Sequence, residues 1–240
     1  TPIKSSAASD VYKRQVYNRR KESYINSCNP AFIEWGRRVG NERFYEYLSK
    51  LGILGKTGID LPGEASTIIH KIENVGEVEL ATMSFGQSFQ ITPVIMLRAA
   101  AAIVNGGKLV TPHFAVKAAG ADGETVQEFC YETVTDAITE ETSNTMKDIL
   151  RQVVEDGGGK NAYIEGFSIG GKTATSQKLP RGSGKYIASF VGFSSVDNPR
   201  VIAMCLIDEP QGVYYGGTIA APVIRELFEN ILPYLEIYPN

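Results

Sequence analysis

The stretch that decides the fold reads Gly166-Phe167-Ser168-Ile169-Gly170-Gly171-Lys172-Thr173-Ala174-Thr175-Ser176. It satisfies three sequence patterns, and each pattern requires a different local structure. G-x-x-x-x-G-K-[ST] is a phosphate-binding loop that opens a helix, whereas G-x-S-x-G is a nucleophile elbow between a strand and a helix. The third pattern is an extended strand that presents Lys172 and the hydroxyls after it. The residues that follow this stretch therefore decide among the three.

A helix after Thr173 is excluded by composition, because Pro180, Gly182 and Gly184 follow closely. Without a helix N-terminus the loop lacks the amides and the dipole that hold phosphate. This argues against a P-loop nucleotidase, although an apolar run does end at Asp208 as a magnesium-binding strand would.

The nucleophile elbow fails for a related reason, since it needs a strand before Ser168 and a helix after it. Both histidines, His70 and His113, also lie upstream of Ser168, so no acid-histidine pair follows it. We predict instead a β-strand over residues 168–176.

Along the whole chain, the sequence predicts helices first, then a run of adjacent strands, and then a final helix. Helices are predicted from Pro30, from a cap at Asn41, from Thr92 to Gly106, from Thr139 to Gly157 and from about Pro222; strands over 114–118, 126–131, 168–176, 187–194 and 201–207, with turns at Asp122-Gly123 and 196–199. This order predicts an α+β fold in which helices pack on an antiparallel sheet.

Composition excludes several classes of function. The chain of 240 residues is 43% apolar and 21% charged, which suits a globular protein, and its net charge of −3 does not favour a nucleic-acid partner. No apolar run approaches the roughly 18 residues that span a bilayer. Cys28, Cys130 and Cys205 form neither a CxxC pair nor an even framework, so no metal site, cofactor or disulfide scaffold is predicted.

Residues 1–15 are small, polar and aperiodic, and residues 9–15 resemble translated sequencing-adapter read-through. We therefore expect a non-native leader at 1–15, an assembly artefact, and a partial domain at 16–240.

A second motif gives the K-T-G strand pattern its weight. Ser27-Cys28-Asn29 fits S-x-N, and Lys172-Thr173-Ala174-Thr175 resembles K-T-G. Further matching stretches are 27–32, 56–65, 81–87 with 91–93, 159–162, and 208–210 with 215–217 and 220–223. Over Tyr24 to Tyr234 the chain resembles the division- and sporulation-type class B penicillin-binding proteins. The literal Lys56-Thr57-Gly58 lies in a Gly/Pro loop, so we assign the active motif to Lys172.

The resemblance implies a penicillin-binding transpeptidase fold similar to the serine β-lactamases, incomplete at the N-terminus. It implies a D,D-transpeptidase that cross-links peptidoglycan by serine acyl transfer, and that takes D-Ala-D-Ala stem peptides and β-lactams. The implied place is the extracytoplasmic face of the bacterial membrane, reached through an N-terminal anchor outside this sequence. Division or sporulation proteins are the implied partners.

The resemblance also assigns roles. Ser27 would relay a proton, and Asn29 would hydrogen-bond the substrate amide. Lys172 would orient Ser27 and attract the substrate carboxylate. The hydroxyls of Thr173 and Thr175 would bind that carboxylate, while the Thr175 N–H would stabilise the oxyanion.

Two departures from the family pattern matter. Ala174 replaces the motif's glycine and adds a methyl group beside the substrate. No S-x-x-K occurs in the sequence; Thr1-Pro2-Ile3-Lys4 has its spacing but the wrong hydroxyl. We therefore expect no nucleophile in this chain, no penicilloyl adduct, and poor solubility from an unpaired apolar sheet edge. A non-catalytic pseudo-enzyme that binds peptidoglycan or a partner is the alternative.

Overall fold

The structure is a computed structural model that describes residues 20–180 and 182–239. The predicted leader at 1–15 lies outside the described residues. The elements in chain order are α2 (Arg20–Ile25), α3 (Asn29–Lys50), η1 (Ile72–Asn74), α4 (Glu77–Ser84), α5 (Pro93–Val104), β1 (Leu109–Val110), β2 (Lys117–Ala119), β3 (Thr125–Glu128), β4 (Thr133–Val134), α6 (Glu140–Glu155), η2 (Lys160–Ala162), β5 (Ile169–Gln177), β6 (Tyr186–Ser194), β7 (Val201–Asp208), α7 (Gly216–Ile219) and α8 (Ala221–Tyr234).

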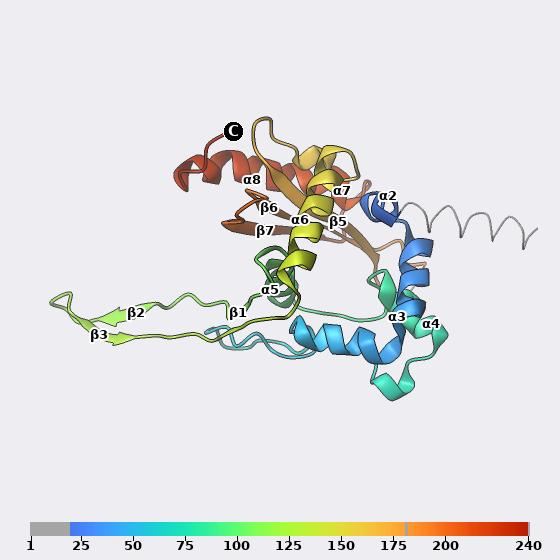
Figure 1. Cartoon of the computed structure of the whole chain (residues 1–240), viewed down its shortest axis with the longest axis horizontal. Coiled ribbons are helices and arrows are strands. Elements are labelled where there is room, and N and C mark those ends of the chain that lie inside the picture. Colours follow the sequence, from blue (N-terminus) through green and yellow to red (C-terminus); the bar gives the residue numbers. More distant parts are fainter. Residues whose placement is uncertain (1–19, 181, 240) are drawn as a thin grey trace, which may run out of the picture.

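The main sheet of the described chain is antiparallel, with the strand order β5-β6-β7. Helix α8 lies along one of its faces, and α5 and α6 lie on the other side (Figure 1). Alternation along β6 sends Phe190 toward Phe228 of α8, whereas Phe193 packs with Leu150 of α6 and Val104 of α5. The α+β prediction, the three strands and the final helix are therefore confirmed.

Two of the helices begin at the threonines that the sequence predicts as caps. The Thr92 hydroxyl accepts a hydrogen bond from the Ile95 N–H at 3.3 Å, and Thr139 does the same for the Thr142 N–H at 3.2 Å. Such caps satisfy one of the amides that a helix N-terminus leaves free.

The two helices predicted from Pro30 and from Asn41 form one element, α3, with a break inside it. Gly40 has φ 74° and ψ 165°, a conformation that glycine adopts without steric cost. Asn41 directly follows the break, and its side-chain amide donates to the Val75 carbonyl at 2.7 Å. The predicted boundary is thus a kink, and Asn41 ties α3 to the segment after η1.

The strands predicted over 114–118 and 126–131 are shorter and shifted, so their predicted bounds are wrong. They form β2 and β3, which pair in a hairpin with the predicted turn at Gly123. The hairpin reaches away from the body as an arm (Figure 1), and residues 121–130 are all exposed. A ribbon without a layer behind it has no core to fix its register, and the register shifts at Ala118/Ala119.

The outer edges of β5 and β7 pair with no further strand among the residues described here. β7 carries the apolar sequence Val201–Ile207, and Leu206 is 43% exposed. This edge agrees with the unpaired apolar sheet edge that we expect from the sequence. The poor solubility expected from such an edge stays a prediction. Within the same residues, none of the helices combines the length and the apolar character that crossing a membrane requires.

Candidate active site

The S-x-N segment forms the corner between α2 and α3. The Cys28 N–H donates to the Ser23 carbonyl at 2.8 Å and the Ser27 N–H donates to the Tyr24 carbonyl at 3.1 Å. These two bonds make a Schellman motif, which requires a left-handed residue at the position of Ser27. Ser27 adopts φ 52° although it is not glycine. Its hydroxyl is therefore held at a fixed corner, and Asn29 follows, exposed, in the first turn of α3.

Helix α2 is fastened to the rest of the domain at several points. Burial of Tyr24 raises the pKa of its phenol to about 12. The Lys21 ammonium lies 2.7 Å from Asp148 on α6, and the hydrogen bonds from Lys21 and Arg151 lower the pKa of Asp148 to about 2. Ile25 packs against Gly157, where an added Cβ would lie 2.9 Å from the Ile25 carbonyl oxygen. These contacts fix the corner that carries Ser27.

Lys172 lies in the middle of β5, and its ammonium donates a hydrogen bond to the Ser27 hydroxyl. A second bond runs from the same nitrogen to the Thr173 carbonyl at 3.1 Å. Burial lowers the pKa of Lys172 to about 8, because a desolvated ammonium is disfavoured. The structure thus brings together two segments that are 145 positions apart in the sequence.

The two competing patterns are wrong, because strand β5 (Ile169–Gln177) directly follows Ser168 and runs through Lys172, where each pattern requires a helix to start. The acids that suggested a magnesium site are neutralised by lysines: Asp208 lies 2.9 Å from Lys178, and Glu209 lies 2.8 Å from it. No cluster of metal-ligating residues occurs in the described part of the chain.

The literal Lys56-Thr57-Gly58 is a loop, as the sequence predicts. Glu64 accepts hydrogen bonds from the Thr57 N–H and hydroxyl, both at 2.7 Å, and from the Gly58 N–H at 3.2 Å. Three donors to one carboxylate close this loop on itself.

The hydrogen-bond pattern of β5 shows which of its backbone groups face outward. The Lys178 N–H donates to the Lys185 carbonyl at 2.9 Å, and the Ser195 N–H donates to the Ser168 carbonyl at 3.0 Å. In an antiparallel ladder the bonded residues alternate, so the even-numbered residues of β5 bond to β6. The backbone groups of Thr173 and Thr175 therefore point to the open edge. The Thr175 N–H is therefore on the open edge, close to Lys172 along the strand.

The side chains of Thr173 and Thr175 leave the strand on the face opposite Lys172, toward α7. The Thr175 hydroxyl accepts a hydrogen bond from the Gly216 N–H at 3.1 Å. A hydroxyl has one proton to donate in addition to its lone pairs, so Thr175 still has a donor to offer. Ala174 is exposed on the Lys172 side, with its methyl toward the open site.

Sequence reasoning missed the residues that support this edge from behind. A Cβ on Gly216 would lie 2.2 Å from the Ser189 carbonyl oxygen and 2.4 Å from that of Ala174, so only glycine fits. The Asn161 side-chain amide donates to the Gly217 carbonyl at 2.8 Å. Asn161 and Gly216 lie in two of the stretches that resemble the family, 159–162 and 215–217, but such a resemblance does not show which residues are in contact.

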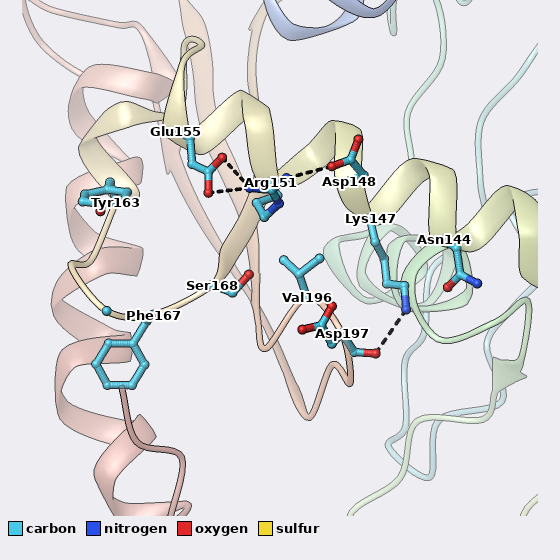
Figure 2. Close-up of a pocket in the computed structure, with 11 residues that line it drawn as sticks. Asn144, Lys147, Asp148, Arg151, Glu155, Tyr163, Phe167, Ser168, Val196 and Asp197 are labelled. Carbon is cyan, nitrogen blue, oxygen red and sulfur yellow. Dashed lines mark hydrogen bonds and ion pairs between the residues drawn. The ribbon is translucent and has the colours of Figure 1, made fainter. Parts of the chain in front are cut away.

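A pocket of about 710 Å³ lies elsewhere, between α6, residues 163–168 and the turn after β6. Figure 2 shows Arg151 between Asp148 and Glu155 on its wall, with Lys147 donating to the Asp197 carbonyl. None of the predicted site residues lines this pocket. The candidate active site is therefore the junction of Ser27 and Lys172.

Comparisons with known proteins identify the family of this chain. The penicillin binding protein transpeptidase domain matches residues 4–229. Stage V sporulation protein D of Bacillus subtilis is 40% identical over 220 residues, covering 90% of this chain and 34% of that protein. PenA of Neisseria meningitidis, whose name describes a peptidoglycan D,D-transpeptidase, is 31% identical over 219 residues, covering 89% and 36%.

Solved structures show the same fold. Penicillin binding protein 3 from Mycobacterium tuberculosis, complexed with ampicillin, superimposes with a TM-score of 0.82 at 26% identity, covering 92% of this chain and 52% of that one. The chain spans about a third of the length of the curated relatives above. It belongs to the penicillin-binding protein transpeptidase domain family.

Proposed function

We propose that this chain supplies the carboxylate-binding and proton-relay part of the active site of a serine D,D-transpeptidase that cross-links peptidoglycan. The observation that carries the proposal is the hydrogen bond from Lys172 to Ser27, made between the sheet edge and the α2–α3 corner. Acyl transfer needs a proton relay, an oxyanion donor and a cation for the substrate's carboxylate, all within reach of one another.

The relay is the role proposed for Ser27. Its hydroxyl accepts from Lys172 and keeps a proton to pass on, and a lysine pKa of about 8 allows exchange near neutral pH. Asn29, two residues further along the chain, is proposed to hydrogen-bond the substrate amide. The Thr175 N–H on the open edge is the proposed oxyanion donor, a contact type worth roughly 3 kcal/mol.

The proposed substrates are stem peptides that end in D-Ala-D-Ala, and β-lactams are proposed as ligands of the same site. Both carry a carboxylate, which suits the partly buried cation of Lys172 and the hydroxyls of Thr173 and Thr175. The relative named as a D,D-transpeptidase and the solved relative complexed with ampicillin support this choice.

The nucleophile is assigned to no residue of this sequence, because S-x-x-K is missing from it. We propose that acylation requires a serine outside these 240 residues. This chain, treated with a fluorescent penicillin, should therefore show no covalent adduct by gel or intact mass. A stoichiometric adduct that maps to a serine of this chain would refute the assignment.

Binding without acylation tests the rest of the proposal. A diacetylated Lys-D-Ala-D-Ala peptide is titrated into the labelled chain, and the same peptide with an amidated C-terminus is the matched control. We expect shifts at Ser27 and Lys172 and about tenfold weaker binding of the amide, since a charge-assisted bond is lost. Equal binding of the two peptides would contradict the proposed carboxylate site.

For the intact protein we propose a place on the extracytoplasmic face of the bacterial membrane and a partner in division or sporulation. The relative named Stage V sporulation protein D supports the sporulation role. A fluorescent fusion to the full-length gene tests it: a signal at the division site or at the forespore supports the proposal, and a diffuse cytoplasmic signal contradicts it.

The alternative is a non-catalytic protein that binds peptidoglycan or a partner, and the missing S-x-x-K is the observation that favours it. The complete gene decides between the two. A full-length protein that binds the peptide acid but forms no penicilloyl adduct would establish the alternative.

A further inference from the structure

Residues 157–161 touch both sides of the candidate site. An added Cβ on Gly157 would lie 2.9 Å from the Ile25 carbonyl of α2, the helix that leads to Ser27. One residue on, the Gly158 carbonyl oxygen lies 2.4 Å from where a Cβ of Gly217 would be. This glycine turn is therefore in backbone contact with the Ser27 side and with the α7 side at once.

Asn161 extends the turn with a side-chain contact. It lies in η2 beside the fully buried Ala162, and its amide donates to the Gly217 carbonyl at 2.8 Å. The neighbouring Gly216 N–H donates to the Thr175 hydroxyl at 3.1 Å. Two hydrogen bonds thus lead from Asn161 through the first turn of α7 to Thr175.

Helix α7 has only four residues, and the side chain of its N-cap residue, Tyr215, makes no capping hydrogen bond, so the helix depends on its neighbours for its position. Gly216 already touches the Ser189 and Ala174 carbonyls and can move only away from the sheet. The bond from Asn161 opposes that movement, because it holds the next carbonyl.

We propose that Asn161 is a positioning residue, which acts through Gly216 to orient the Thr175 hydroxyl toward the terminal carboxylate of a peptide ligand. When the hydroxyl accepts from Gly216, its rotation is restricted and its own proton points to the remaining directions. This inference rests on the proposed function, because it names the group that recognises the carboxylate of that substrate.

The chemistry of the side chain is specific. Only an amide N–H can donate to the Gly217 carbonyl from this position; an aspartate of the same size is an acceptor only. Asn161→Asp therefore removes the bond without changing the volume. Thr175→Val removes the hydroxyl in the same way, and Asn144→Asp, which adds the same charge at an exposed asparagine of α6, is the matched control.

The experiment measures the preference for the peptide acid over the peptide amide in the full chain. We expect Asn161→Asp and Thr175→Val each to reduce this preference about fivefold, while Asn144→Asp keeps it. The double variant should lose no more than Thr175→Val alone, because both changes act on one hydroxyl. Additive losses, or an unchanged preference in Asn161→Asp, overturn the inference.

A second readout needs no ligand. Hydrogen exchange of the Gly216 amide should speed up at least tenfold in Asn161→Asp and stay unchanged in Asn144→Asp, since a weakened bond opens more often. If the wild-type chain shows no acid preference, the proposed function fails, and the Gly216 amide still decides whether Asn161 holds this turn. Unchanged exchange at Gly216 overturns the inference by itself.

Discussion

Replacing Lys172 by methionine should change how the stability of the domain depends on pH. Lys172 is partly buried beside Ser27, and burial lowers its pKa from the ordinary 10.5 to about 8. Methionine has a similar length and no charge, so it keeps the packing and removes the titration. The difference between the two proteins isolates this one amine.

The sign follows from proton binding. Between pH 8 and 10.5 the unfolded chain keeps the lysine proton while the folded chain has released it, so the free energy of unfolding rises with pH. The span from 10.5 to about 8 corresponds to roughly 3 kcal/mol, an upper figure for a group that water still reaches. Below pH 8 the folded wild type must bury a charged amine, which lowers its free energy of unfolding, so Lys172→Met should be the more stable protein.

Urea unfolding of both proteins from pH 6.5 to 10.5 measures the effect. From pH 8 to 10.5 we expect the free energy of unfolding of the wild type to rise by roughly 3 kcal/mol relative to that of Lys172→Met. Tyr24 has a raised pKa, which lowers the free energy of unfolding as pH rises above 10. Both proteins contain Tyr24, so its contribution cancels in the difference between them. Lys117→Met, at an exposed lysine of the arm, should show no such trend.

A constant difference between wild type and Lys172→Met would refute the reasoning, because it would mean that Lys172 titrates as in water.

Ligand binding provides the opposite trend. Affinity for the peptide acid should fall as pH rises through 8, while stability increases, since the neutral amine no longer attracts a carboxylate.

Three further predictions concern single positions. Ser27→Gly should leave the free energy of unfolding in urea unchanged or higher, because glycine adopts φ 52° without cost; clear destabilisation would contradict this. Gly216→Ala should destabilise by about 3 kcal/mol or more, whereas Gly55→Ala, where a Cβ meets nothing within 4 Å, should be nearly neutral in the same urea assay. Thr92→Ala should cost about 1 kcal/mol in thermal or urea unfolding through loss of the α5 cap, and no loss would show that the cap is dispensable.

Much of the fold is readable in the sequence because local signals and packing agree. The Thr92 and Thr139 caps each precede a helix, and β-branched and aromatic residues over 187–194 and 201–207 mark the buried strand β6 and the partly exposed strand β7 beside it. Where no layer lies behind the chain, prediction fails. The arm around Gly123 is exposed, so its strand bounds depend on register alone, which the apolar pattern does not specify.

The candidate site, like the fold, is only partly predictable from the sequence. Ser27 and Lys172 are identified by motif, and the stretch after Thr173 excludes the competing patterns. Which β5 groups face outward, however, depends on the hydrogen-bond phase with β6, and no sequence pattern encodes it. The contacts of Asn161 and Gly216 likewise join segments brought together only by the fold.

The site holds two local costs, and they lie on the two residues that meet. Lys172 keeps an amine where burial disfavours its charge, and Ser27 keeps a left-handed backbone that glycine would adopt more easily. Each cost supports a chemical property: a lysine that titrates near neutral pH and a hydroxyl fixed against it. The Schellman turn and the Lys21–Asp148 ion pair hold the corner in place against these costs. Stabilising changes at Lys172 should therefore weaken binding of the peptide acid, and stabilising changes at Ser27 should remove the proposed proton relay, because the features that lower stability also set the geometry of the site.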